Sequence, residues 1–266
     1  MKVTSLVDNV CLSPLCGAEH GLSLYIELDS GAKVLFDMGQ GDLFSRNAEA
    51  LGIDLSNVDI AVVSHGHYDH GGGLETFHRL NSKAKVYIRE SALRGHGSIK
   101  PDGLKDIGIR CEDISRLVFC GERESLPFGI TLFSNPPADF PDPPGNSLLT
   151  GPGGTRDDFS HEQNMLIREG GSVVLFGGCA HRGIVNILAA AQTLSGGAVT
   201  HVFSGMHIGK GNPSDEYLSS LARALLSFPE VRYFTMHCTL EEGFLKLKKP
   251  MGERIAYLSC SQSISI

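Results

Sequence analysis

A cluster of metal-binding residue types directly follows a short apolar segment, and this arrangement restricts the fold more than any other sequence feature. Residues 59–64 (DIAVVS) have the length and apolar character of a buried β-strand. The H-x-H-x-D-H pattern of His65, His67, Asp69 and His70 comes next, followed by three glycines. Two histidines one residue apart on an extended turn can direct both imidazoles at one ion, and the Asp-His pair can serve a second. Nitrogen ligands with one carboxylate suit Zn²⁺, Fe or Mn better than Mg²⁺ or Ca²⁺.

Short apolar runs alternate with helical periodicity along most of the chain, which predicts an α/β fold. Strands are expected at residues 22–28, 32–36, 59–64, 85–88, 172–176, 199–203, 231–236 and 254–258. The first two flank a turn and predict a hairpin. Helices are expected at residues 42–51, 74–80, 184–194, 214–226 and 239–249. A capping box of Thr239 and Glu242 is expected to open the last helix.

Residues 95–160 interrupt this pattern and predict a long loop region. The segment 136–152 holds six of the twelve prolines, so it cannot form a regular helix or a central strand. A loop of this length in a compact domain is usually functional or disordered. Two interpretations remain open, a lid over a substrate site and a plain surface excursion.

Composition places the chain among ordinary globular proteins. Its 266 residues are 41% hydrophobic and 20% charged, enough for one large domain or two small ones. The net charge of −7 argues against a general binder of nucleic acid or anionic membrane. No signal peptide or membrane span is visible, and the seven scattered cysteines favour free thiols over disulfides. We therefore expect a cytoplasmic protein with a small-molecule substrate, and a homo-oligomer is left open.

Polar residues with catalytic or metal-binding chemistry follow several predicted strands. In layered α/β folds, functional sites collect where loops leave the strand ends, so these side chains are expected to converge. They are Asp37, His65, Cys179, His181, His207 and His237. No phosphate-binding loop, dinucleotide-binding loop or nucleophile elbow is present, so nucleotide-hydrolase, Rossmann and serine-hydrolase interpretations have no motif support.

The H-x-H-x-D-H motif resembles that of the metallo-β-lactamase superfamily, and the similarity extends over nearly the whole chain. The segment 36–39 (FDMG) resembles the superfamily's strand-end F-D-T-G. Further segments resemble a branch similar to the dihydropterin/β-ribofuranosylaminobenzene 5′-phosphate synthases: 19–23 (EHGLS), 178–183 (GCAHRG), 205–208 (GMHI) and 236–239 (MHCT). The resemblance implies an α/β fold, an αββα sandwich of two mixed β-sheets flanked by helices, in a single domain, 1–266.

The resemblance also implies a metal centre of one or two divalent ions, Zn²⁺ with Fe or Mn as alternatives. It assigns His65, His67 and His181 to a first ion, and Asp69, His70 and His237 to a second. Asp37 would support the histidines, although it could also be a plain turn former. Cys179 stands where most binuclear members carry a bridging Asp. It could ligate or bridge, or be a small buried neighbour of the site.

Other polar residues are candidates for the substrate side of the site. His207 could bind a substrate phosphate or donate a proton, and Arg182, His20 and Lys210 could bind an anion. A direct role for His161 with Glu162 is a weaker hypothesis, and His78, His96 and His201 are typical of packed or surface histidines.

The reaction expected of such a site is hydrolysis by a metal-activated water, oriented by Asp69, on a small anionic substrate such as a phosphoester or a pterin-linked phosphate. Two alternatives remain, a synthase or transferase of the branch's type and a non-hydrolytic iron-binding redox protein.

Overall fold

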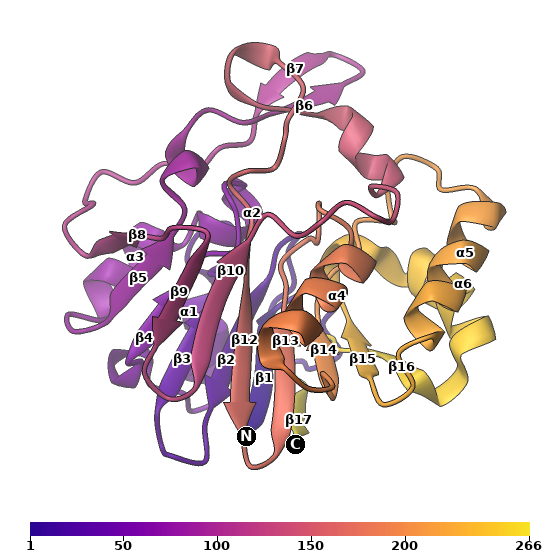
Figure 1. Ribbon diagram of the computed structural model, residues 1–266. Helices are drawn as coiled ribbons and strands as arrows, with labels where there is room; N and C mark the ends of the chain where they lie inside the picture. Colours follow the sequence, from indigo (N-terminus) through magenta and orange to yellow (C-terminus); the bar gives the residue numbers. More distant parts are fainter.

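Two seven-stranded sheets pack face to face in the computed structural model, which describes residues 1–266 (Figure 1). The strands of the first sheet, in spatial order, are β17 (Ser263–Ser265), β1 (Lys2–Val7), β2 (Ser23–Glu27), β3 (Lys33–Phe36), β4 (Ile60–Val62), β5 (Lys85–Ile88) and β8 (Leu117–Phe119). Those of the second are β16 (Ile255–Tyr257), β15 (Arg232–Thr235), β14 (His201–Phe203), β13 (Ser172–Phe176), β12 (Gln163–Glu169), β10 (Ile130–Ser134) and β9 (Arg123–Leu126). Both sheets are mixed, with parallel pairing from β3 to β8 and from β13 to β16.

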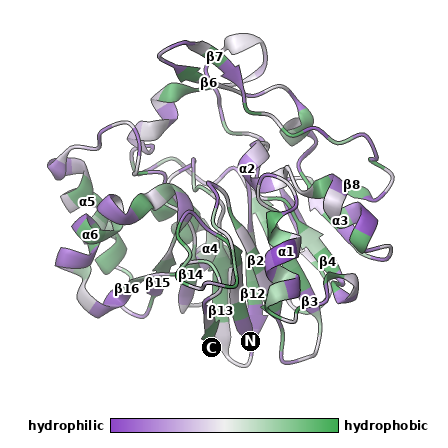
Figure 2. Ribbon diagram, turned by 180° about the vertical axis from the view of Figure 1, so that it is seen from behind, coloured by the Kyte–Doolittle hydropathy of each residue, from purple (hydrophilic) through white to green (hydrophobic).

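Helices cover the outer face of each sheet, so the molecule has four layers. One apolar cluster joins the inner faces of the two sheets, with Phe36 and Val62 from the first against Met165 and Phe176 from the second. The first sheet packs against α1 (Leu43–Ala50) and α3 (Leu74–Leu80), and the second against α4 (Ile184–Ser195), α5 (Asp215–Leu226) and α6 (Leu240–Met251). Figure 2 shows the apolar strands between the more polar helix surfaces. The predicted αββα architecture is therefore confirmed.

Most elements expected from the sequence are present, with boundaries shifted by a few residues. The strand expected at 172–176 matches β13 at both ends, and the helix expected at 184–194 matches α4 to within one residue. The capping box at α6 is wrong. Thr239 Oγ1 accepts a hydrogen bond from the Met206 amide instead, and Glu242 pairs with Lys246. The buried hydroxyl of Thr239 therefore serves as the hydrogen-bond acceptor for a backbone amide in the loop after β14, rather than for an amide at the start of the helix.

Residues 95–160 are not one loop, contrary to the expectation. Strands β8, β9 and β10 from this region extend the two main sheets. A third, three-stranded sheet is formed by β6 (Gly97–Lys100), β7 (Gly103–Asp106) and β11 (Leu149–Thr150). It lies at the end of the sandwich that carries the short helix α2 (Tyr68–Gly71), opposite the chain termini (Figure 1). The proline-rich stretch itself contains only short 3-10 helices and a two-residue strand, as its composition predicts.

The remaining elements are single turns of 3-10 helix, at Leu55–Asn57, Glu90–Leu93, Pro144–Leu148, Pro152–Gly154, His237–Thr239 and Gly252–Arg254. None of the helices has the length and apolar character needed to cross a membrane.

Candidate metal centre

The residues expected to bind metal gather at one end of the sandwich, where loops leave both sheets. His65 and His67 follow β4, and Asp69 and His70 lie in α2 directly after them. From the second sheet, the loops after β13, β14 and β15 carry His181, His207 and His237. The two sheets therefore each contribute half of one site, which explains why residues more than 100 positions apart meet there.

Three imidazoles converge to form a first group. His65 Nε2 lies 3.0 Å from His67 Nδ1 and 3.3 Å from His181 Nε2. Around a tetrahedral ion with bonds of about 2.0 Å, neighbouring ligand atoms lie about 3.3 Å apart. Burial and the neighbouring histidines lower the pKa of all three rings well below the usual value, so they are neutral, the form that binds a metal. The donor set and its spacing therefore fit a divalent ion such as zinc.

A second group lies beside the first and contains the carboxylate. His237 Nε2 is 3.2 Å from His70 Nε2 and 3.4 Å from Asp69 Oδ2. Burial raises the pKa of Asp69, but the hydrogen bond with His237 and the nearby histidines outweigh it and hold that pKa well below the usual range. His20 Nε2 also lies 3.2 Å from Asp69 Oδ2, so His20 is placed as a further neighbour of this group. His237 thus lies close to both His70 and Asp69, which is compatible with a second ion, and ligand atoms of His20, Asp69 and His237 all lie within 4.8 Å of one another.

Cys179 lies between the two groups. Its Sγ is 3.2 Å from His70 Nε2, and ligand atoms of His65, His70 and Cys179 all lie within 4.8 Å of one another. Burial raises the pKa of the Cys179 thiol well above its usual value, with the neighbouring Cys238 adding to the shift. A coordinated metal would deprotonate such a thiol. The position is compatible with a bridging ligand and with a buried neighbour, so both interpretations from the sequence remain.

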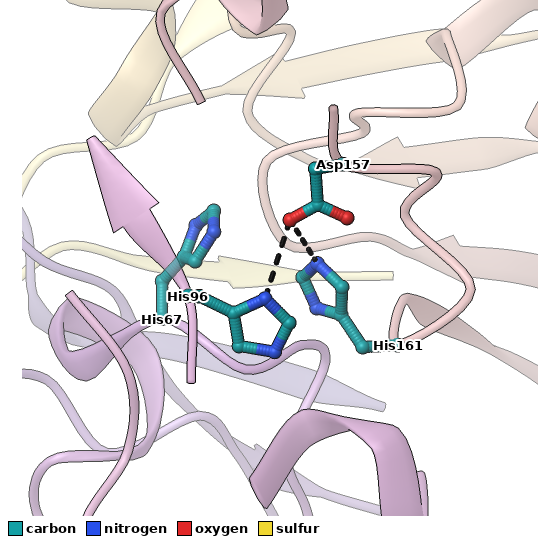
Figure 3. A group of neighbouring side chains, drawn as sticks. All are labelled: His67, His96, Asp157 and His161. Carbon is teal, nitrogen blue, oxygen red and sulfur yellow. Dashed lines mark hydrogen bonds and ion pairs between the residues drawn. The ribbon is translucent and has the colours of Figure 1, made fainter. Parts of the chain in front are cut away.

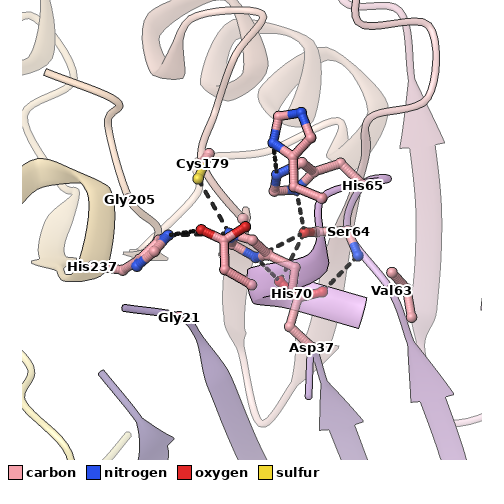
Figure 4. A network of polar contacts seen from close by, with 12 residues as sticks. Gly21, Asp37, Val63, Ser64, His65, His70, Cys179, Gly205 and His237 are labelled. Atoms are coloured by element: carbon pink, nitrogen blue, oxygen red, sulfur yellow. Dashed lines mark hydrogen bonds and ion pairs between the residues drawn. The ribbon is translucent and has the colours of Figure 1, made fainter. Parts of the chain in front are cut away.

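Asp37 and Ser64 hold both groups in place through one hydrogen-bond network (Figure 4). The Asp37 carboxylate lies 2.7 Å from His70 Nδ1 and accepts hydrogen bonds from the backbone and side chain of Ser64, also at 2.7 Å. Ser64 Oγ is in turn 2.8 Å from His65 Nδ1. One buried carboxylate thus orients a histidine of each group, a common way of fixing ligand rings.

Two asparagines orient the remaining histidines. Asn146 Oδ1 lies 3.0 Å from His181 Nδ1, and Asn9 Oδ1 lies 2.9 Å from His237 Nδ1. Neither asparagine was identified from the sequence. Both are far from their histidines along the chain, so no local pattern could reveal them.

The backbone around the centre is unusually strained. Four residues here have positive φ values, between 48° and 61°: Asp37, Ala180, His207 and His237. Non-glycine residues rarely adopt this conformation, and such strain concentrates at functional sites.

A substitution at Gly178 should disturb the network without removing any of its polar groups. A Cβ atom there would clash with Ser64 Oγ and lie 3.0 Å from His65 Nδ1. We expect Gly178→Ala to lower the free energy of unfolding by about 1–3 kcal/mol, because Ser64 must move. Chemical denaturation measures this change. Gly197→Ala is the matched control, since open space surrounds Gly197, and an equal loss in the two variants would contradict the account.

A cavity of about 340 Å³ opens onto the two groups. Besides the ligand residues, its lining contains the carboxylate of Asp106 and a set of basic and aromatic side chains: His20, Tyr68, Lys100, Lys105, His207 and Lys210. Lys100 and Lys105 come from the third sheet, so this sheet forms part of the cavity wall. Neither lysine was identified from the sequence, because only the fold brings the β6–β7 hairpin over the metal centre.

Arg182 lies apart from this cavity. Its guanidinium donates a hydrogen bond to the Asp158 carbonyl at 2.9 Å and lines a different pocket, while its backbone amide binds Glu162. His207 is placed at the cavity instead, with its ring centre 4.3 Å from that of His181. Burial, with the charge of Lys210, lowers the pKa of His207 to about 3. The ring is therefore neutral near pH 7 and suited to hydrogen bonding rather than to carrying a charge.

Comparisons with known proteins agree with this geometry. The family model of the metallo-β-lactamase superfamily matches residues 16–237. Among curated relatives from Methanocaldococcus jannaschii, the uncharacterized protein MJ0448 is 28% identical over 92% of this chain and 91% of its own length. The 7,8-dihydropterin-6-methyl-4-(β-D-ribofuranosyl)-aminobenzene-5′-phosphate synthase is 25% identical over 90% of this chain and 88% of its own length.

Solved structures give the same result. The crystal structure of Tm1679, named as a metal-dependent hydrolase of the β-lactamase superfamily, has a TM-score of 0.84 and 25% identity, covering 100% of this chain and 99% of its own. Zn²⁺-bound PqqB from Methylobacterium extorquens, with a TM-score of 0.58, 13% identity and full coverage of both chains, shares the fold alone. Together with the family match over most of its length, these findings show that the chain belongs to the metallo-β-lactamase superfamily.

Proposed function

We propose that the protein is a metal-dependent hydrolase that uses water to cleave a small anionic substrate. The observation that carries this proposal is a cluster of converging ligand residues at a cavity that three lysines also line. The similarity to a protein named as a metal-dependent hydrolase supports it. A cavity of about 340 Å³ suits a small molecule rather than a polymer.

The metal centre would be held by His65, His67 and His181 in one group and by Asp69, His70 and His237 in the other. When bound, divalent ions of this kind lower the pKa of water and polarise the substrate. Zinc is the metal we propose, with iron or manganese as alternatives for a nitrogen-rich ligand set.

The protein's own residues would orient the reactants. The ionised carboxylate of Asp69 faces the cavity, where it can accept a hydrogen bond from the attacking water. The neutral ring of His207 lines the cavity, where it can bind a substrate oxygen. Asp37 and Ser64 keep the ligand rings fixed while the reaction proceeds.

Substrate charge would be recognised by lysines at the rim. The Nζ of Lys210 lies 3.3 Å from the Nε2 of His20, next to the second ligand group. Lys100 and Lys105, from the third sheet, line the same cavity. A phosphate or phosphoester is the anion that we propose for this position, since hydrogen bonds from ammonium groups to phosphate are strong. Arg182, which lines another pocket, is not needed for this part of the proposal.

Loss of the Lys210 charge should weaken substrate binding more than turnover. We expect Lys210→Ala to raise KM for p-nitrophenyl phosphate about tenfold, because a hydrogen bond from a charged group contributes about 1.5–3 kcal/mol. Steady-state kinetics at fixed ionic strength measures this. Lys246→Ala, which removes a surface ion pair with Glu242, is the control and should leave KM unchanged. An unchanged KM in Lys210→Ala would exclude this lysine from the anion site.

The proposed activity can be tested with zinc-loaded protein and a small panel of esters. Phosphomonoesters, phosphodiesters, a lactone and a thioester are each offered with water as the only other reactant. We expect turnover of at least one phosphoester, with release of alcohol and phosphate. A protein that binds zinc but leaves every compound intact would contradict the hydrolase proposal.

A synthase is the second candidate, because the chain is 25% identical to a named synthase over 90% of its length. In that case the same centre would activate a second organic substrate instead of water. Turnover that requires this second substrate, and fails in water alone, would favour the synthase. Strong visible absorbance with redox activity and no ester cleavage would instead favour an iron-binding redox protein.

A further inference from the structure

A second cluster of buried metal-binding residue types lies directly behind His67, outside the cavity (Figure 3). His96 precedes β6, while Asp157 and His161 lie on the segment that leads into β12. One ligand atom from each of His67, His96, Asp157 and His161 lies within 4.8 Å of the others. All four residues are at most 5% exposed.

The spacing inside this cluster matches that of ligands around a metal. Asp157 Oδ2 is 3.2 Å from His96 Nδ1 and 3.2 Å from His161 Nε2. Charge-assisted hydrogen bonds from nitrogen to a carboxylate are usually shorter, about 2.7–2.9 Å. A tetrahedral zinc ion with bonds of about 2.0 Å separates its ligand atoms by about 3.3 Å.

One ring nitrogen of His67 has no hydrogen-bond partner, although it is buried. Its Nδ1 is directed to the first ligand group, 3.0 Å from His65 Nε2. Its Nε2 is buried and has no hydrogen-bond partner. A buried ring nitrogen without a partner costs free energy, so an ion bound on that side of the ring would remove this cost.

We propose that His67, His96, Asp157 and His161 bind a further zinc ion, with His67 bridging it to the first metal group through its two ring nitrogens. The donor set of three imidazoles and one carboxylate is that of a closed, four-coordinate zinc site. Binding of the ion requires the His67 ring to release its remaining N–H proton and His161 to release the proton on Nε2, both to solvent. The ion would sit behind the centre and fix the orientation of His67, without reaching the substrate.

Backbone contacts determine which ring nitrogens of His96 and His161 face the proposed ion. His161 Nδ1 accepts a hydrogen bond from the Gly66 amide at 2.9 Å, so the ring proton is on Nε2, which is directed to Asp157, and this proton must leave when the ion binds. His96 Nε2 lies 3.1 Å from the Ser91 carbonyl, so Nδ1 is the nitrogen that faces Asp157. His96 thus donates its second ring N–H to a backbone carbonyl, as is usual for metal ligands.

The main alternative is a hydrogen-bonded group that merely supports the loop of His67. In that case Asp157 would pair with His96 and His161, and a water molecule would fill the space beside His67 Nε2. The proposal is separable from the hydrolase proposal, because it concerns metal at residues that do not line the cavity, apart from the shared His67.

The test is the location and number of zinc ions in the full-length protein after dialysis against zinc. Crystals of the wild type are measured on both sides of the zinc absorption edge. We expect an anomalous peak about 2.0–2.2 Å from His96 Nδ1, Asp157 Oδ2 and His161 Nε2, in addition to those in the cavity. Zinc peaks in the cavity alone would overturn the proposal and leave the proposed hydrolase intact.

Elemental analysis of variants provides an independent measurement. Asp157→Asn and His96→Gln should each lose one zinc ion per chain relative to the wild type. His201→Gln is the matched control, because this histidine lies on β14 away from both ligand sets, and it should lose none. An unchanged zinc content in folded Asp157→Asn and His96→Gln would overturn the proposal. If neither variant folds, the anomalous peaks of the wild type decide the question alone.

Discussion

His181→Ala is expected to remove one metal ion from the cavity and to lower hydrolytic turnover by about a thousandfold, because a catalytic metal supplies several kcal/mol of transition-state stabilisation. His181 completes the first group with His65 and His67 and is the only one of the three contributed by the second sheet. Without it, two histidines remain and the site lacks a third protein ligand. Elemental analysis and steady-state kinetics on the same preparation measure both effects.

The control for this substitution is His201→Ala, which truncates a half-buried histidine that stacks on Phe234 away from the centre. It should retain the full metal content and turnover. The assignment of His181 would be wrong if its alanine variant kept all its metal, or if it lost metal and remained fully active.

Asp37→Ala is expected to lower the free energy of unfolding by about 3–5 kcal/mol, the usual cost of removing one partner from a buried charged pair. Asp37 is fully buried, and its loss leaves the Ser64 amide, the Ser64 hydroxyl and His70 Nδ1 without their acceptor. Because both ligand groups depend on this carboxylate, metal affinity should also fall about 10–100-fold. Denaturation of the metal-free protein and zinc binding measured by calorimetry separate the two effects.

Two further variants make this prediction specific. Asp37→Asn keeps the side-chain volume and one acceptor, so it should recover part of the stability. Asp139→Ala removes an exposed carboxylate and should change stability by less than about 0.5 kcal/mol. Equal stability of Asp37→Ala and the wild type would show that the network contributes little to the fold.

The fold could be predicted from the sequence wherever periodicity was strong. Runs such as residues 172–176 and 184–194 combine apolar character with clear strand or helix spacing, and they match β13 and α4. Strands β6 to β10 were hidden among glycines, prolines and charged residues. Several of them are exposed, as in β7, and pair for reasons of tertiary context that local propensity does not record.

The site could be predicted where its ligands share one motif or follow a strand. His65, His67, Asp69 and His70 lie within six residues, so their spacing alone indicates a metal. Asn9, Asn146 and the lysines of the third sheet reach the site only because distant loops meet there. A position next to a ligand in the sequence can also mislead. Arg182 follows His181 and was expected to bind an anion, but its side chain is directed to Asp158 instead.

Zinc titration of metal-depleted protein, with hydrolysis of a phosphodiester such as bis(p-nitrophenyl) phosphate followed throughout, tests the central claim most directly. The account predicts no cleavage without metal, a rise with added zinc until the cavity groups are filled, and no rise in His65→Ala. Cleavage that persists unchanged after metal removal, or a zinc-filled protein that cleaves nothing, would contradict it.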